Sequence, residues 1–326
     1  MTTNLLSVQG LSVDYHVGRR HVCAVEDVSL DVGADETVGL VGESGSGKTT
    51  IARAVLGLAK ARAGTIRFDD EDITHAGKSQ RRRLSRDMQV VFQDPYGSLS
   101  PTRTVAQTLT EPLLAHRIAS GQTAHDQAAD MLARVGLEPD ALRRYPREFS
   151  GGQRQRIAIA RALMPSPRLV VCDEAVSALD LSVQAQVLNL LRDLQREYRL
   201  GYLFVAHNVS VVRHISDRIV VLYRGTVMES GPAEAVCTKP GHPYTRALLQ
   251  AVPVADPDRQ AARRAVATPA EHVSAPPTGS GCPFAARCPH VIDACRRERP
   301  PLVAAPGGTQ VACIRAEELA GYSPPG

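Results

Sequence analysis

A glycine-rich motif near the amino terminus places the strongest constraint on the fold. Residues 42–49 read GESGSGKT, a full match to the pattern GxxxxGK[ST], between the strand-like run TVGLV and the helix-like run TTIARAVLGLA. In such a strand–loop–helix unit, backbone N–H groups and the helix N-terminus hold phosphate oxygens, the lysine reaches the β and γ phosphates, and the next hydroxyl binds Mg²⁺. The nucleotide-binding residues expected here are Gly42, Ser44, Gly45, Gly47, Lys48, Thr49 and Thr50, with Thr49 also a Mg²⁺ ligand.

Short apolar runs rich in β-branched residues alternate with helix-like stretches through most of the chain. They cover residues 37–41, 90–93, 169–172, 203–206 and 219–223. This alternation predicts an α/β domain with a mainly parallel sheet, which is the fold class that a P-loop requires.

The chain divides into segments of different composition. Residues 1–252 form the expected nucleotide-binding domain, in which residues 97–165 have helical periodicity and predict a helical subdomain. Residues 253–281, rich in Pro, Ala and Asp, are interpreted as a linker. Residues 282–326 carry four cysteines and are interpreted as a small C-terminal metal-binding domain.

A pair of acids at the end of an apolar run supplies the second half of a nucleotide site. The sequence LVVCDE ends in Asp173 and Glu174. Ligands of open α/β sheets bind at the carboxyl ends of the strands, so these acids are expected beside the glycine-rich loop. Asp173 is predicted to hold Mg²⁺, and Glu174 to act as the general base on the attacking water.

The segment FSGGQ, residues 149–153, opens another amphipathic helix and predicts a second phosphate-binding N-terminus. One nucleotide cannot readily occupy both places on one domain. A head-to-tail pair of subunits solves this, with Ser150, Gly151, Gly152 and Gln153 of each subunit facing the nucleotide on the other. These residues resemble the signature LSGGQ of the ABC (ATP-binding cassette) ATPases.

The resemblance implies roles for further residues. Gln93 in VVFQDP is similar to the glutamine that senses Mg²⁺ as a ligand and couples the site to the membrane subunits. Asp180 in SALD resembles the aspartate of a loop that crosses the dimer interface. His207 is similar to the histidine that contacts the γ-phosphate, and Tyr15 is the candidate for stacking on adenine. Two positions depart from the family pattern, Ala175 in place of proline and Asn208 in place of aspartate; neither has a direct chemical role, so an active ATPase is expected.

Within the family, the segments HPYTRALLQAV and GCPFAARCPHVIDAC resemble ATP-binding subunits of bacterial oligopeptide and dipeptide importers. This resemblance implies ATP-driven peptide import by a peripheral protein on the cytoplasmic face of the membrane. The implied partners are a homologous second ATP-binding subunit, two transmembrane permease subunits and, indirectly, an external solute-binding protein. Import of another small solute, such as a nickel complex, and action of a soluble ABC ATPase on nucleic acid are the alternatives.

Cysteines cluster in the last segment, at Cys282, Cys288, Cys295 and Cys313. In a reducing cytosol, such a group is more typical of a metal site than of disulfides. Thiolates at loop positions suit zinc or an iron–sulfur cluster. The importer resemblance implies a [4Fe–4S] cluster, with zinc as the second candidate and reduced thiols without metal as the third.

Composition narrows the partners and the compartment. Lys and Arg number 38 against 34 Asp and Glu, a net charge of +4, and Trp is absent. This near balance gives no electrostatic reason to expect nucleic acid, and an aromatic platform for bases is poorly supported. The amino terminus lacks the pattern of a secretory signal and the apolar runs are short, so a cytosolic protein is expected.

Overall fold

The computed structural model describes residues 4–18, 20–251 and 281–319, and the linker expected at 253–281 lies almost entirely outside them. The main sheet has the strand order β11-β12-β10-β9-β3-β8-β7-β6. Its strands are β3 (Thr37–Val41), β6 (Met88–Val91), β7 (Leu169–Asp173), β8 (Gly201–Val205), β9 (Arg218–Tyr223), β10 (Thr226–Pro232), β11 (Val303–Ala305) and β12 (Thr309–Val311).

The centre of this sheet is parallel. β3 pairs in parallel with β8 and β9, and β7 with β6 and β8. All residues of β3 and β8 are buried, as in parallel sheets covered on both faces. The predicted parallel sheet is therefore confirmed, with strand ends that differ from the apolar runs by up to two residues.

A second sheet is antiparallel, with the order β2-β1-β4-β5. Its strands are β1 (Asn4–Val17), β2 (Arg20–Gly33), β4 (Ala63–Phe68) and β5 (Glu71–Asp72). The apolar runs of the sequence do not predict this sheet. It shares an apolar core with helix α1 and the main sheet, which includes Leu6, Leu40 and Ile51, all fully buried.

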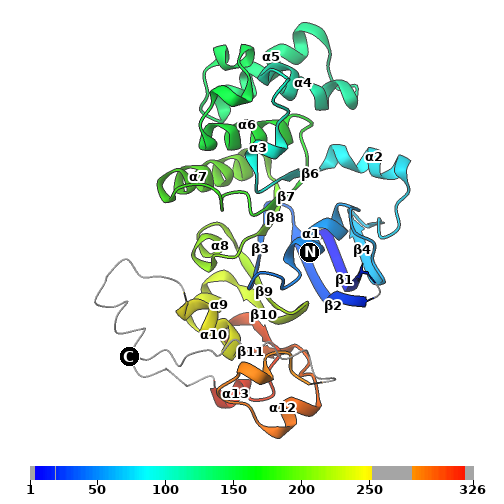
Figure 1. Ribbon diagram of the computed structural model, residues 1–326, viewed down its shortest axis with the longest axis vertical. Helices are drawn as coiled ribbons and strands as arrows, with labels where there is room; N and C mark the ends of the chain where they lie inside the picture. The colour runs from blue at the N-terminus through cyan, green and yellow to red at the C-terminus, as the bar shows by residue number, and fades with distance from the viewer. Residues whose placement is uncertain (1–3, 19, 252–280, 320–326) are drawn as a thin grey trace.

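Helices connect most of the strands of the main sheet. The α-helices are α1 (Lys48–Val55), α2 (Lys78–Asp87), α3 (Pro95–Ser98), α4 (Val105–Ala115), α5 (Gly121–Arg134), α6 (Gly151–Leu163), α7 (Leu181–Tyr198), α8 (Val209–Ile215), α9 (Ala233–Thr238), α10 (Pro243–Gln250), α12 (Asp293–Arg297) and α13 (Ala316–Leu319). Short 3-10 helices are η1 (Pro139–Arg143), η2 (Pro146–Glu148), η3 (Ala285–Arg287) and η4 (Pro306–Gly308). Figure 1 shows α4 and α5 at one end of the molecule and α12 and α13 at the other. Among the helices that the structure describes, none is both long and apolar enough to cross a membrane.

The C-terminal segment extends the main sheet. β12 pairs antiparallel with β10, and β11 pairs antiparallel with β12. Two ion pairs also join the segment to the amino-terminal half, Arg287–Glu43 at 2.9 Å and Arg299–Glu26 at 2.8 Å. The described part of this segment is thus joined to the nucleotide-binding half through backbone and side chains alike.

Candidate functional site

The glycine-rich loop connects β3 to α1, and its geometry depends on glycine. Gly47 precedes α1 with φ 100°, and a Cβ there would lie 2.6 Å from the carbonyl oxygen of Ala24. Gly42 has φ 153°, and its Cβ would meet the carbonyl oxygen of Leu222 at 2.1 Å. Side chains are excluded at both positions, so the loop backbone packs tightly between β2 and β9. Ser44 and Gly45 lie at the exposed tip of the loop.

Lys48 lies under this loop, at the start of α1. Its side chain is buried, and its Nζ donates hydrogen bonds to the carbonyl oxygens of Gly42 at 2.8 Å and Glu43 at 2.9 Å. Burial lowers the pKa of the Lys48 ammonium, while the nearby carboxyl groups of Glu174 and Asp173 oppose that change. A buried cation aimed along a glycine-rich loop suits binding of phosphate oxygens.

Two of the three expected Mg²⁺ ligands, Thr49 and Asp173, are in contact. Thr49, in the first turn of α1 beside Thr50, donates its hydroxyl to Oδ1 of Asp173 at 3.1 Å. Asp173 ends β7, and burial raises the pKa of its carboxyl although the Thr49 hydrogen bond lowers it. A hydroxyl and a partly buried carboxyl at one point fit a hard divalent cation, which would compensate the desolvation of the carboxylate.

Glu174 and His207 meet at the carboxyl edge of the sheet. Nδ1 of His207 lies 3.7 Å from Oε2 of Glu174. Glu174 has φ 51°, a left-handed conformation that ends the extended course of β7, while its N–H still donates to the carbonyl oxygen of Val205 of β8 at 2.9 Å. Ala175 is buried behind it, and Asn208 caps α8 by accepting from the N–H of Ser210 at 2.9 Å.

The FSGGQ residues lie at the start of α6, among the helices, whereas the glycine-rich loop is at the start of α1 (Figure 1). Ser150 and Gln153 form a reciprocal capping box. A Cβ at Gly152 would lie 2.4 Å from the side chain of Val183, and a Cβ at Gly151 would lie 3.8 Å from the side chain of Leu179. The signature therefore packs against the start of α7, the helix that Asp180 caps by accepting from the N–H of Val183 at 3.0 Å.

Gln93 and Tyr15 lie on elements other than those that carry the glycine-rich loop and the acid pair. Gln93 is exposed two residues beyond the end of β6, at the same carboxyl edge as Asp173, because β6 and β7 run parallel. Tyr15 lies on β1 opposite Val22 of β2 and is about one-third exposed, at 36%. The β1–β2 hairpin that carries Tyr15 is the one that packs against Gly47.

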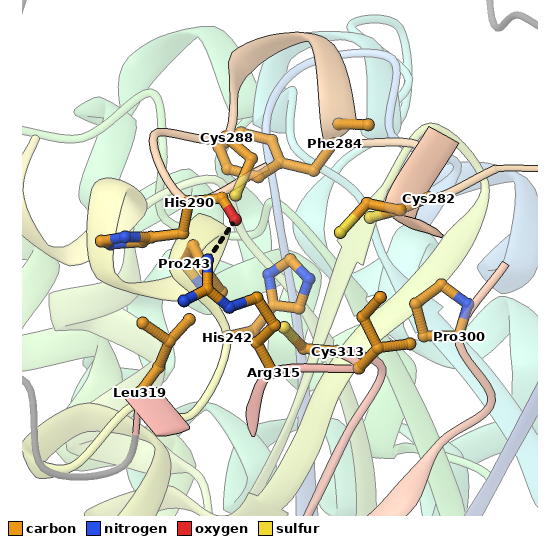
Figure 2. A pocket seen from close by; sticks show the side chains of 13 residues that line it. His242, Pro243, Cys282, Phe284, Cys288, His290, Pro300, Cys313, Arg315 and Leu319 are labelled. Carbon is orange, nitrogen blue, oxygen red and sulfur yellow. Dashed lines mark hydrogen bonds between the residues drawn. The ribbon is translucent and has the colours of Figure 1, made fainter. Parts of the chain in front are cut away.

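The four C-terminal cysteines line one pocket, together with His242, Phe284 and Arg315 (Figure 2). All four are free thiols, and the cavity measures about 20 Å³. Burial raises the pKa of Cys282, Cys313 and Cys288, the last to about 11, which favours the thiol over the thiolate that binds metal. In the described ranges no group of three or more His, Cys, Asp or Glu side chains is placed to hold a metal ion. The arrangement therefore does not support the expected metal-binding domain.

One residue of the loop has partners that its place in the sequence does not indicate. Glu43 contacts Tyr244 of α10 and Arg287 of η3, which are 201 and 244 residues further along the chain. Nothing in the local spacing of Glu43 indicates such distant contacts. In the sequence, the HPYTRALL segment, which contains Tyr244, indicates only the resemblance to peptide importers and no contact with the loop.

Comparisons with known protein families find two matches along the chain. A family model described as "ABC transporter" matches residues 25–177. A second, described as "Oligopeptide/dipeptide transporter, C-terminal region", matches residues 228–295. The first match spans the glycine-rich loop, the FSGGQ segment and the two acids. The second spans most of β10, all of α10 and three of the four C-terminal cysteines.

Several named proteins are similar over nearly their full length. A Brucella ovis protein, whose name assigns it to peptide import as an ATP-binding protein, is 48% identical over 96% of this chain and 98% of its own. The di/tripeptide transport ATP-binding protein DppF of Pseudomonas aeruginosa is 42% identical over 97% and 99%. Among solved structures, a dimeric ATP-binding cassette in a post-hydrolysis state with ADP and Pi is 29% identical, with a TM-score of 0.64 over 70% of this chain and 98% of that one.

Proposed function

This chain belongs to the ATP-binding subunits of ABC transporters, and we propose that it hydrolyses ATP to drive import of oligopeptides or dipeptides across the cytoplasmic membrane. The observation that carries the ATPase assignment is the contact between Thr49 and Asp173, which joins the phosphate loop to the acid pair. The peptide substrate rests on the match of residues 228–295 and on relatives named for peptide transport. Those relatives do not favour the alternatives of a nickel complex or nucleic acid.

The residues divide the chemistry among them. Lys48 and the backbone of the loop bind the β and γ phosphates, and Thr49 and Asp173 hold Mg²⁺, which neutralises phosphate charge when it is bound. Glu174 accepts a proton from the attacking water, and His207 and Gln93 lie at the same edge of the sheet to contact the γ-phosphate and the metal. Tyr15 stacks on adenine from the β1–β2 hairpin.

The assembly follows from the FSGGQ residues at the start of α6, the second expected phosphate-binding helix. Ser150, Gly151, Gly152 and Gln153 complete the nucleotide site of a homologous second ATP-binding subunit, and Asp180 lies in the same interface. The pair works on the cytoplasmic face with two transmembrane permease subunits, which receive solute from an external solute-binding protein. ATP binding closes the pair and hydrolysis reopens it, which reorients the membrane subunits.

The decisive variant is Glu174→Gln. It removes the base and keeps the size and one acceptor oxygen, so ATP binding is expected to persist while hydrolysis falls by about 10²–10⁴-fold. Uptake of labelled peptide into proteoliposomes that hold the complete transporter should fall in parallel. Glu138→Gln, at an exposed position before η1, is the matched control and should leave both rates unchanged. Normal turnover by Glu174→Gln would contradict the assigned role.

We also infer that Cys282, Cys288, Cys295 and Cys313 hold a [4Fe–4S] cluster, with zinc as the alternative. The inference rests on the type of the donors and on the importer resemblance, because four cysteine thiolates are the usual ligands of such a cluster. The thiols are not arranged around a metal ion in this structure, so binding of a cluster would require them to move together and to lose their protons. Anaerobic preparations should be brown, absorb at about 400 nm and contain about four iron atoms per chain. Stoichiometric zinc would select the alternative, and absence of both metals would reject the inference.

A further inference from the structure

Every polar group of Glu43, the second residue of the glycine-rich loop, has a partner. Its carbonyl oxygen accepts from the N–H of Ser46 at 3.1 Å and from Nζ of Lys48 at 2.9 Å. Its own N–H donates to the hydroxyl of Tyr244 at 3.0 Å. Its carboxylate oxygens accept from Nη1 of Arg287 at 3.0 and 2.9 Å. Glu43 thus links the turn of the loop and Lys48 to the C-terminal region, by which we mean α10 together with residues 281–319.

The two C-terminal partners are held firmly. Tyr244 is 1% exposed, and its ring centroid lies 4.6 Å from that of Tyr223 and 5.4 Å from that of Phe284. The guanidinium of Arg287 lies 5.8 Å from the Tyr223 ring and 5.7 Å from the Phe284 ring. Hydrogen bonding to Glu43 raises the pKa of Arg287, so its charge is retained at every working pH. Both groups are therefore fixed before a nucleotide arrives.

We propose that Tyr244 and Arg287 are positioning residues for the phosphate-binding loop. They fix the backbone and carboxylate of Glu43, whose carbonyl oxygen in turn places Lys48, so the C-terminal region sets the affinity for MgATP. The proposal rests on the proposed function, because it concerns the same nucleotide site. It also gives the C-terminal region a role in the ATPase cycle that does not require a redox reaction.

The cysteine pocket is adjacent to this contact. Arg287 ends η3 and directly precedes Cys288, and Phe284 lines the pocket between Cys282 and Cys288 (Figure 2). The contact with Glu43 and one wall of the cysteine pocket therefore come from the same short stretch of chain, residues 282–288.

The test measures MgATP binding to the full chain by calorimetry, with KM and kcat of the assembled ATPase as the second readout. Tyr244→Phe removes the hydroxyl alone, and Arg287→Gln removes the charge. Each should raise Kd and KM for MgATP by about 3- to 10-fold, as expected for loss of one hydrogen bond of moderate strength, with kcat nearly unchanged. Arg287→Lys should restore part of the affinity, because the cation remains.

Two comparisons separate positioning from general stability. Arg299→Gln breaks the second ion pair that joins the C-terminal segment to the amino-terminal half, to Glu26 at 2.8 Å, and should leave Kd for MgATP unchanged. The double variant Glu43→Gln, Arg287→Gln should be no weaker than either single variant, because both remove the same contact. Unchanged affinity in Tyr244→Phe, additive effects in the double variant, or an equal loss in Arg299→Gln would each overturn the proposal. A wild-type chain that fails to bind MgATP would instead overturn the proposed function.

Discussion

At the scale of single residues, Glu229 is a buried carboxyl with a structural task. It lies on β10, fully buried, and its two oxygens accept from the N–H groups of Gly241 at 2.7 Å and His242 at 3.0 Å. These bonds fix the chain at the entry to α10, which carries Tyr244. Burial raises the pKa of Glu229 although the backbone hydrogen bonds lower it. Its ionisation therefore costs stability in the folded chain.

Replacement of this carboxyl should give a pH-dependent change in stability. A carboxyl whose pKa is raised by folding contributes stability below its unfolded value, about 4.3, and loses it as the pH rises through the raised value. Glu229→Gln leaves one backbone N–H without an acceptor, a cost of about 1–3 kcal/mol. This loss should be greatest in acid and shrink as the pH rises.

The measurement is the urea unfolding midpoint of the wild-type protein and of Glu229→Gln, at pH values below and above the pKa of Glu229. Glu317→Gln, exposed on α13, is the control and should leave the midpoint unchanged. A difference that grows with pH would contradict the assignment.

At the scale of elements, helix caps offer a matched test. Asn208 accepts from the N–H of Ser210 at the start of α8, whereas Ser120, before α5, makes no such side-chain bond. Asn208→Ala should lower the free energy of unfolding by about 1 kcal/mol, and Ser120→Ala by clearly less. Asn208→Asp keeps the acceptor and adds charge at a helix N-terminus, so it should preserve stability. Urea unfolding of the three variants decides; equal losses at both caps would contradict this account.

The same scale explains what could be predicted from the sequence. Buried runs such as β3 stand out because most of their residues are apolar. The glycine-rich loop, the acid pair and FSGGQ are recognised from local spacing. β1 was missed because register shifts between Val8 and Leu11 and between Leu11 and Val13 break its alternation of buried residues. β11 and β12, of three residues each, are too short for periodicity and depend on pairing with β10.

At the scale of the whole molecule, the C-terminal region and the nucleotide-binding half share one sheet. Val311 of β12 pairs with Glu229 of β10 and is fully buried, whereas its neighbour Val303 on β11 is 43% exposed. A Cβ on Gly241 would lie 2.6 Å from Val311, so the side chain fills the space beside the entry to α10. Loss of packing at Val311 should therefore also lower the stability of the nucleotide-binding half.

Val311→Ala tests this continuity. Removal of two buried methyl groups and the resulting cavity should cost about 2 kcal/mol, and Val303→Ala, at the exposed position of the same pair, much less. If the sheet unfolds as one unit, Val311→Ala lowers the midpoint of a single transition, seen equally by circular dichroism and by loss of MgATP binding. If the C-terminal region unfolds separately, the variant instead produces an early minor transition and leaves MgATP binding until the main one. That second outcome would also weaken the coupling through Glu43, because the contact from Arg287 would be lost while the site still bound nucleotide.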